Sequence, residues 1–262
     1  VSLPNIIINH NEFTIEAWAK MDGVGGGNFN SSTIFQQRDD MTDDYHSAVL
    51  LFADRPAFNV SSFYIRTNTS VANICESDVQ QFGSWHHYAG VTTLDMVYYY
   101  IDGILVDSVE NNETGSYAYS IDYIDIGRHR YNQINQGFFW GDLDEIRIWS
   151  TPRTENEIQN NMFSSIDENT IGLLAYWDFN NQTTDDISGN GHNGVPMGDA
   201  EFLATNYFDC ALTGDVNSDQ SVDIYDVLTT VDFVLGRDVY IHYPCTDCND
   251  DGQINILDVV CI

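Results

Sequence analysis

Basic side chains are scarce in this sequence. Nine Lys and Arg residues stand against forty Asp and Glu residues, which gives a formal net charge of −31 at pH 7, and Lys20 is the only lysine. A surface of this charge repels phosphate backbones and anionic membranes, so nucleic acid is excluded as a partner. Most of these carboxylates are interpreted as solvated surface groups. The regularly spaced carboxylates near the C-terminus need another explanation.

Long apolar runs are also missing. No run of about eighteen apolar residues occurs, so the sequence predicts no membrane-spanning helix. The first residues do not form a basic-then-apolar leader, so any signal peptide is expected to be removed or to lie outside this sequence. Apolar residues still make up 43% of the 262 residues, which is enough for a core. We expect one large domain with a small appendage.

Cysteine is sparse and unevenly placed. Apart from Cys75, the cysteines lie at positions 210, 245, 248 and 261. Cys245 and Cys248 form a CxxC, a pattern that can bind zinc or do redox chemistry, but no second close pair completes a zinc site. In an extracellular protein, a disulfide from Cys210 to Cys245 or Cys248 is the favoured interpretation. Glycosylation sequons typical of secreted proteins occur at Asn30, Asn59, Asn68, Asn112 and Asn181.

Residues 1–206 consist of short alternating segments separated by Gly, Asn, Asp and Ser. Asp102-Gly103 is a strong hairpin signal, and Thr154 with Glu157 forms a capping box that predicts a short helix over Thr154–Met162. Many short strands at this spacing predict a mostly β domain, a two-sheet antiparallel jelly-roll sandwich. The alternation predicts strands at Phe13–Trp18, Trp85–Val91, Val97–Ile101, Ile121–Ile126 and Leu143–Trp149.

An ordered set of segments in this domain resembles the LamG-like domains of the concanavalin A-like lectin/glucanase superfamily. The resemblance implies a jelly roll that binds glycans, proteins or other surfaces, often with a calcium ion. Asp142 and Asp144 are candidate ligands for that ion, or else ordinary turn and edge residues. The segments are Phe13–Trp18, Trp85–Val91, Tyr100–Gly103, Ile126–Arg128, Gly141–Trp149, Gly172–Phe179 and Ser188–Gly194.

Catalysis is not expected. Related glucanases use a Glu-x-Asp-x-x-Glu run that places nucleophile and acid/base on one strand face, and no such run occurs. A glycan-active enzyme that uses Asp144 or Glu145 is therefore only a third hypothesis. The aromatic runs Tyr98–Tyr100 and Phe138–Trp140 are candidates either for the core or for sugar-stacking platforms.

Residues 207–262 have a different character and predict a separate α-helical unit. Ile224, Val227, Leu228, Val231, Val234 and Leu235 recur at helical spacing, and Gly236 follows as a C-cap. Two loops repeat the same spacing, with side-chain oxygens at positions 1, 3, 5, 9 and 12 and a backbone carbonyl available at position 7, as a calcium ion requires. Two in-register copies predict two calcium ions. Their ligands would be Asp215, Asn217, Asp219, Ser221, Asp223 and Asp226 in the first loop, and Asp247, Asn249, Asp251, Gln253, Asn255 and Asp258 in the second.

These loops resemble a type I dockerin, whose loop-helix repeats end in Asp at position 12. The resemblance implies calcium-dependent folding and docking to a partner, with the second helix incomplete at Ile262. Ile224-Tyr225 and Ile256-Leu257 occupy positions 10 and 11, where cellulosomal dockerins carry a polar pair, so cohesin is not the expected partner. The variant is more similar to dockerin-like repeats of secreted bacterial proteins, which implies an extracellular or cell-surface location.

The leading hypothesis is a secreted, non-catalytic adhesion or assembly protein. Its sandwich would recognise glycan or protein, and its tail would dock. The alternative is a filament protomer assembled head to tail. LamG-like domains usually begin with a strand that precedes the equivalent of Val1–Pro4, and the missing strand would leave a sheet edge open to strand donation.

Overall fold

The computed structural model describes residues 1–3, 7–8, 11–23, 31–38, 48–55, 60–67, 72–78, 82–112, 123–131, 134–203, 214–216, 221–237, 246 and 254–261. The chain forms two compact units. The first consists of Val1–Ile158 and Asp167–Phe202, and the second of Gln159–Ile166 and Leu203–Ile262. In the described residues no helix is long and apolar enough to cross a membrane. The predicted domain boundary between residues 206 and 207 stays a prediction.

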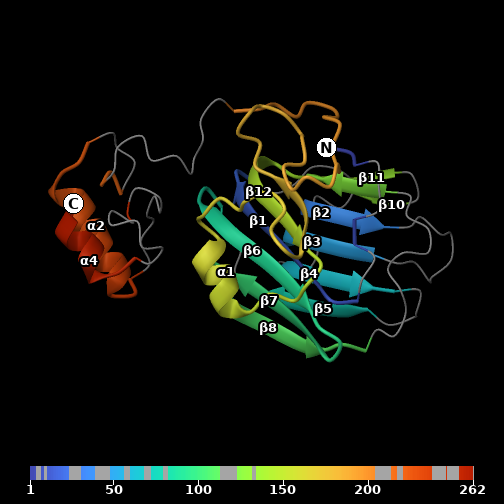
Figure 1. Cartoon of the computed structure of the whole chain (residues 1–262), viewed down its shortest axis with the longest axis horizontal. Helices are drawn as coiled ribbons and strands as arrows, with labels where there is room; N and C mark the ends of the chain where they lie inside the picture. Colours follow the sequence, from blue (N-terminus) through green and yellow to red (C-terminus); the bar gives the residue numbers. More distant parts are fainter. Residues whose placement is uncertain are drawn as a thin grey trace. The chain divides into compact units, whose positions relative to one another are not determined.

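Two antiparallel sheets make up the first unit (Figure 1). One sheet has the order β13-β12-β1-β6-β7-β8, with β13 at Leu173–Trp177, β12 at Gly141–Trp149, β1 at Phe13–Met21, β6 at Trp85–Thr92, β7 at Met96–Ile101 and β8 at Ile104–Glu110. The other has the order β5-β4-β3-β2-β9, with β5 at Asn73–Ser77, β4 at Val60–Arg66, β3 at Ala48–Arg55, β2 at Ser32–Arg38 and β9 at Tyr123–Ile126. A separate hairpin joins β10 at Arg128–Tyr131 to β11 at Ile134–Phe138.

The core lies between the two sheets, because alternate residues of each strand point inward. Phe13 and Ile15 of β1, Leu51 of β3, Phe63 of β4 and Tyr99 of β7 all belong to one buried cluster. The predicted two-sheet antiparallel sandwich is therefore confirmed. The Asp102-Gly103 hairpin is also present, since both residues have positive φ, at 51° and 72°, between the paired strands β7 and β8.

The edge of the five-stranded sheet at β9 is covered by the start of the chain. Ser2 bridges Asp125 and Val195, and Ile126 donates its backbone N–H to the carbonyl of Val1 at 2.9 Å. The first residues of the chain therefore pair with the β9 edge at these positions, and a sheet edge open to strand donation stays a prediction.

One short helix packs on the outer face of the six-stranded sheet. Helix α1 spans Glu155–Asn161, and its Ile158 contacts Ala89, Val91 and Tyr100 in a small buried cluster. The predicted capping box is present: Glu157 accepts the backbone N–H of Thr154 at 2.7 Å, and Thr154 accepts that of Glu157 at 3.3 Å.

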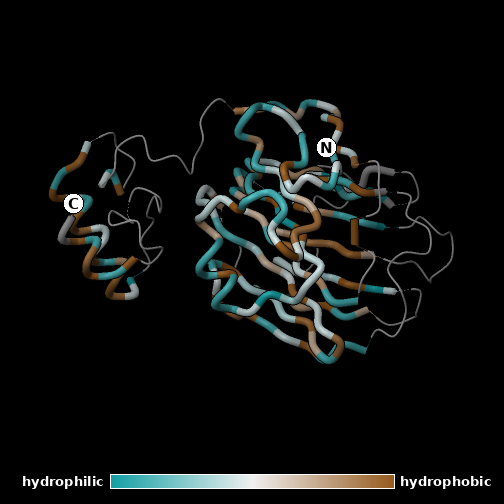
Figure 2. Tube along the Cα trace, viewed as in Figure 1, coloured by the Kyte–Doolittle hydropathy of each residue, from teal (hydrophilic) through white to brown (hydrophobic). Residues whose placement is uncertain are grey.

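The second unit contains helices α2, Ile224–Val234, and α4, Ile256–Cys261. Gly236, with φ at 71°, follows α2 as the sequence predicts, and Arg237 donates its backbone N–H to Asp232 at 3.0 Å. Among the described residues of α2, the buried side chains are Asp226 and Thr230, not those of the apolar stripe. Figure 2 shows hydrophobic, brown stretches along both helices. The exposed large apolar or aromatic side chains on or beside them include Ile224, Tyr225, Leu228, Leu235, Ile256 and Leu257.

Candidate functional site

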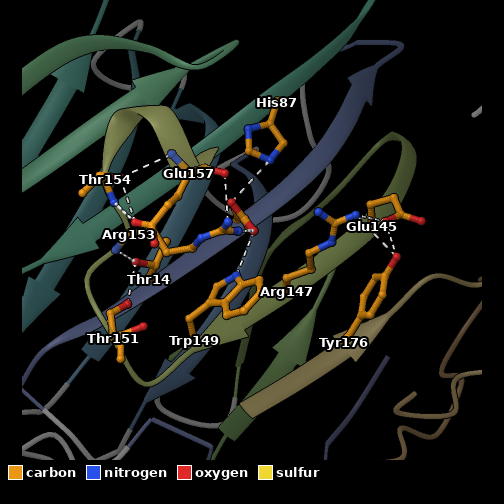
Figure 3. A network of polar contacts seen from close by, with 11 residues as sticks. Thr14, His87, Glu145, Arg147, Trp149, Thr151, Arg153, Thr154, Glu157 and Tyr176 are labelled. Carbon is orange, nitrogen blue, oxygen red and sulfur yellow. Dashed lines mark hydrogen bonds and ion pairs between the residues drawn. The ribbon is translucent and has the colours of Figure 1, made fainter. Parts of the chain in front are cut away.

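A buried glutamate organises the polar contacts on the outer face of the six-stranded sheet (Figure 3). Glu16 of β1 is fully buried and accepts hydrogen bonds from the indole of Trp149 and the guanidinium of Arg153, both at 2.8 Å. His87 lies 3.8 Å away, and burial lowers its pKa to about 4, so it stays neutral at pH 7. Arg153 also donates to the carbonyl of Glu157 at 2.8 Å, which ties α1 to β1.

A second carboxylate group lies further along β12. Glu145 forms an ion pair with Arg147 and accepts the hydroxyl of Tyr176 at 2.5 Å. Its φ of 51° lies in the left-handed region, within a bulge of β12 in the β1–β12 ladder. Burial, Glu145 and Asp178 raise the pKa of Asp144 to about 8, so Asp144 is largely protonated at neutral pH.

This geometry does not suit glycoside hydrolysis. That reaction needs two carboxyl groups flanking an accessible sugar bond. Glu16 and Glu145 are both buried, and an arginine is paired with each of them. The network instead joins β1, β12, β13 and α1, so its role is to hold the outer layer on the sheet. His86 pairs with Asp102 at 2.7 Å, which joins the start of β6 to the turn between β7 and β8.

The two candidate calcium ligands of the sandwich, Asp142 and Asp144, contact different groups. Lys20 forms an ion pair with Asp142 at 3.2 Å, while Asp144 accepts the backbone N–H of Glu145 at 2.8 Å. Throughout the part of the chain that the structure describes, no group of three or more His, Cys, Asp or Glu is arranged to hold a metal ion. A calcium ion in the sandwich stays a prediction.

The two aromatic runs differ in burial: the first packs into the fold, and the second is partly exposed. Tyr99 lies in the core between the sheets, and Tyr98 and Tyr100 pack with Ile158 under α1, so this run is structural. In the second run, Phe139 packs against the core, but the rings of Phe138 and Trp140 are 42% and 63% exposed. The structure therefore leaves Phe138 and Trp140 as the candidate sugar-stacking rings.

A third exposed ring, which the sequence analysis missed, lies at the same end of the sandwich. Phe82 is 45% exposed and bridges Met21, the last residue of β1. On the other side of β1, the carbonyl of Trp140 accepts the backbone N–H of Asp22 at 3.0 Å. We call Phe82, Phe138 and Trp140 the aromatic rim. The backbone of Phe82 and the backbone of Trp140 lie on the two sides of the end of β1.

Local backbone features fix the rim. Gly141 follows Trp140 with φ at 142°, and a Cβ there would collide with the carbonyl of Lys20, so only glycine allows this approach to β1. Polar groups stand beside the rings: Lys20 lies 3.2 Å from Asp142 and 3.6 Å from Asp22. The rim thus combines apolar ring faces with one ammonium and two carboxylate groups, the mixture that sugar faces and hydroxyls match.

The described calcium-loop residues surround the start of each helix. Asp223 is the N-cap of α2, and Asp226 completes a capping box with it. Asp226 is fully buried and also accepts the backbone N–H of Val216 at 2.8 Å, which draws the start of the loop onto the helix. Asp258 repeats this arrangement by accepting the backbone N–H of Asn255 at 2.8 Å. Among the other proposed ligands, Asp215 is buried and Ser221 is exposed.

The remaining predicted ligands lie outside the described residues, namely Asn217, Asp219, Asp247, Asn249, Asp251 and Gln253. The same holds for the proposed disulfide partners Cys210, Cys245 and Cys248. Cys75 is a free, buried thiol that donates to the carbonyl of Val97 at 3.5 Å, and burial raises the pKa of Cys75 to about 12.

Comparison with known proteins identifies the fold. The family model of the concanavalin A-like lectin/glucanases superfamily matches residues 1–159. No curated protein matches the chain. A crystal structure of a proposed carbohydrate-binding protein from Bacteroides ovatus is 19% identical, with a TM-score of 0.52, and the match covers 78% of this chain and 59% of that one.

Two further structures are more distant. The CBM40 domain of the Ruminococcus gnavus IT-sialidase, bound to α2,3-sialyllactose, is 11% identical with a TM-score of 0.47 over 57% of this chain and 81% of that one. The SAP-like pentraxin of Limulus polyphemus is 13% identical with a TM-score of 0.43 over 68% of this chain and 89% of that one.

The family match spans more than half of the sequence, so the chain belongs to the concanavalin A-like lectin/glucanase superfamily.

Proposed function

We propose that this chain is a secreted, non-catalytic glycan-binding protein whose sandwich binds sugar at the aromatic rim. The observation that carries the proposal is the exposure of Phe82, Phe138 and Trp140 around one strand end. Exposed rings stack on sugar faces, and nearby carboxylates accept hydrogen bonds from sugar hydroxyls. Membership of a lectin superfamily supports binding as the activity, and the arginine-paired, buried state of Glu16 and Glu145 supports the absence of hydrolysis.

The proposal is tested by probing the full chain against an array of neutral glycans, with product analysis of each glycan that binds. We expect binding with no release of shorter sugars. The Trp140→Ala variant should bind about five- to thirtyfold more weakly, because stacking on an exposed ring contributes roughly 1–2 kcal/mol. Turnover that disappears in Glu145→Gln would instead establish a glycan-active enzyme.

We further propose that the second unit binds two calcium ions through the twelve loop positions named above and acts as a dockerin-like docking module. The support is the duplicated arrangement of Asp226 and Asp258, each of which accepts the backbone N–H three residues before it. Calcium would supply the charge that brings the loop carboxylates together. The exposed Ile224, Tyr225, Ile256 and Leu257, at positions 10 and 11 of the two loops, would then face an apolar partner.

A filament protomer remains the second candidate. The observation that favours it is β8, an edge strand that exposes Ile104, Leu105 and Val106 in succession. Unprotected apolar edge strands pair with other chains. Electron microscopy of the calcium-loaded protein should show linear polymers if this candidate is correct, and single particles if the glycan-binding reading alone is sufficient.

A further inference from the structure

A second tryptophan lies beside the aromatic rim, on the outer face of the six-stranded sheet. The β1–β6 ladder runs from Phe13 to Lys20, and Lys20 lies directly opposite Trp85 in it. Ala19 and Met21 belong to the core between the sheets, so alternation along β1 places Lys20 on the outer face. Residues that lie directly opposite each other share a face, which puts Trp85 of β6 on the outer face with Lys20.

A row of side chains continues across β1 to the strand that follows the rim. Lys20 lies opposite Asp142 of β12, and the two side chains form an ion pair at 3.2 Å. Asp142 follows Trp140 by two residues. Trp85, Lys20 and Asp142 therefore form one row across β6, β1 and β12. The backbones at the two ends of this row lie two strand spacings apart, about 10 Å, which is wider than a single sugar ring.

This row occupies a different part of the outer face from the part under α1. Helix α1 packs on Ala89 of β6, and Trp85 lies four residues earlier, about 13 Å along the strand. His87, which is buried beside Glu16, separates the two parts. The β6–β7 ladder begins at Tyr88, so Trp85 lies beyond the end of that ladder.

Each member of the row keeps part of its surface in solvent. Trp85 is half-buried, and the side chains of Lys20 and Asp142 are 23% and 22% exposed. Asp22, whose carboxylate lies 3.6 Å from Lys20, is 46% exposed. A sugar stacks on the exposed part of a ring, whatever contacts hold the rest of it, and carboxylates accept hydrogen bonds from sugar hydroxyls. The row thus joins a second ring to polar groups that lie next to Trp140.

From this geometry we infer that the sugar site extends from Trp140 across β1 to Trp85 and takes a linear, neutral oligosaccharide. The ligand needs about three sugar units or more, one on each ring and one over Lys20 between them. This extended site rests on the proposed function, because Trp140 carries one end of the ligand. A neutral chain is favoured because two carboxylates flank the ammonium of Lys20 in a protein of net charge −31, which repels acidic sugars.

The test is calorimetric titration of the full chain with extended, β-1,4-linked oligomers of glucose, mannose, xylose and N-acetylglucosamine, each of one, two, three and six units. Trp85→Ala removes the second ring, and Trp85→Phe keeps a ring at the same place. Tyr64→Ala is the matched control, because Tyr64 is a half-buried ring on the outer face of the other sheet. Thermal unfolding checks that each variant is folded.

In at least one series we expect the affinity to rise with chain length up to about three units and then to level off. Trp85→Ala should weaken binding of the six-unit chain by about three- to tenfold, because that chain loses one of its two stacking rings. Trp85→Phe should stay within about twofold of the native chain, and Tyr64→Ala should leave the affinity unchanged.

Equal affinity for short and long chains overturns the inference, and this comparison needs only the native protein, so it decides the point even if Trp85→Ala does not fold. Equal losses in Trp85→Ala and Tyr64→Ala, or no loss in Trp85→Ala, also overturn it.

The outcomes separate the extended site from the proposed function. If a glycan binds through Trp140 and its affinity depends neither on chain length nor on Trp85, only the extended site fails. The same holds if a glycan of the neutral array binds through Trp140 and none of the four linear series binds. If no neutral glycan binds, both proposals fail.

Discussion

Arg153 donates from Nη1 to Oε1 of Glu16 at 2.8 Å, across 137 positions of sequence, and both side chains are buried. The guanidinium also lies 4.2 Å from the ring centroid of Trp149, and Trp149 donates to the same carboxylate oxygen. This pair joins the first strand of the sandwich to the segment that leads into α1. The outer layer is thereby anchored to the sheet by charge as well as by Ile158.

Replacing Glu16 by Gln should destabilise the sandwich by about 3–5 kcal/mol, because it leaves the Arg153 guanidinium buried without its counter-charge. Urea unfolding followed by tryptophan fluorescence measures the loss. Glu157→Gln is the control, because Glu157 is exposed and glutamine can keep the capping box with Thr154, so the change should cost less than about 0.5 kcal/mol. Equal effects of the two changes would show that the buried pair contributes nothing beyond the cap.

Asp144 gives the sandwich a pH dependence of known sign. Its pKa rises from 3.8 in the unfolded chain to about 8 in the fold, so between these pH values the folded state binds more protons. The stability contributed by this group is complete below pH 4 and is lost as the pH rises toward 8. Asp144→Asn should remove that loss. The free energy of unfolding of the variant, relative to the native chain, should rise by up to about 1.4 kcal/mol per pH unit over this window. A flat difference would contradict the assignment.

Gly90 is required by the core. A Cβ at this position would collide with the ring of Phe63 on the opposite sheet. Gly90→Ala should therefore destabilise the sandwich by about 1–3 kcal/mol through overpacking. Gly23→Ala is the matched control, because a Cβ there meets nothing within 4 Å, and its effect should stay within about 0.5 kcal/mol. Thermal unfolding of both variants decides the point.

Calcium removal should act on the second unit alone. Chelation with EDTA is expected to unfold residues 209–262 and leave the sandwich folded, because small metal-loop units gain their folding energy from the ion. Hydrogen exchange resolved by segment follows both units at once. Asp219→Ala should abolish one of two calcium-binding events in a titration, whereas Asp232→Ala, outside the loop spacing, should preserve both. Unchanged exchange after chelation would exclude calcium-dependent folding.

Much of the fold follows from local sequence signals. The alternation around Phe13–Trp18 and Val97–Ile101 predicts the strands, and Asp102-Gly103 and Thr154 with Glu157 predict the hairpin and the helix start. These signals need no information beyond neighbouring residues. The placement of Arg153 on Glu16, by contrast, depends on which strands become neighbours, and alternation cannot specify a contact across 137 positions.

The candidate sites were harder to predict for the same reason. The sequence of Phe138–Trp140 fits either core residues or sugar-stacking rings. Only the packing of Phe139 against the core decides which rings are exposed. Phe82 carries no motif, and it joins the rim because it bridges Met21. The apolar spacing of α2 predicts a helix, but it does not predict that Ile224 and Leu228 are exposed.

The central claim, that the aromatic rim binds glycan, is tested most directly by calorimetric titration of one neutral glycan into the native chain, Trp140→Ala and Ile171→Ala. Ile171 is 96% exposed and lies outside the rim, so it controls for the loss of any exposed apolar side chain. The account predicts about five- to thirtyfold weaker binding for Trp140→Ala and no change for Ile171→Ala. Equal affinity in all three proteins would contradict it.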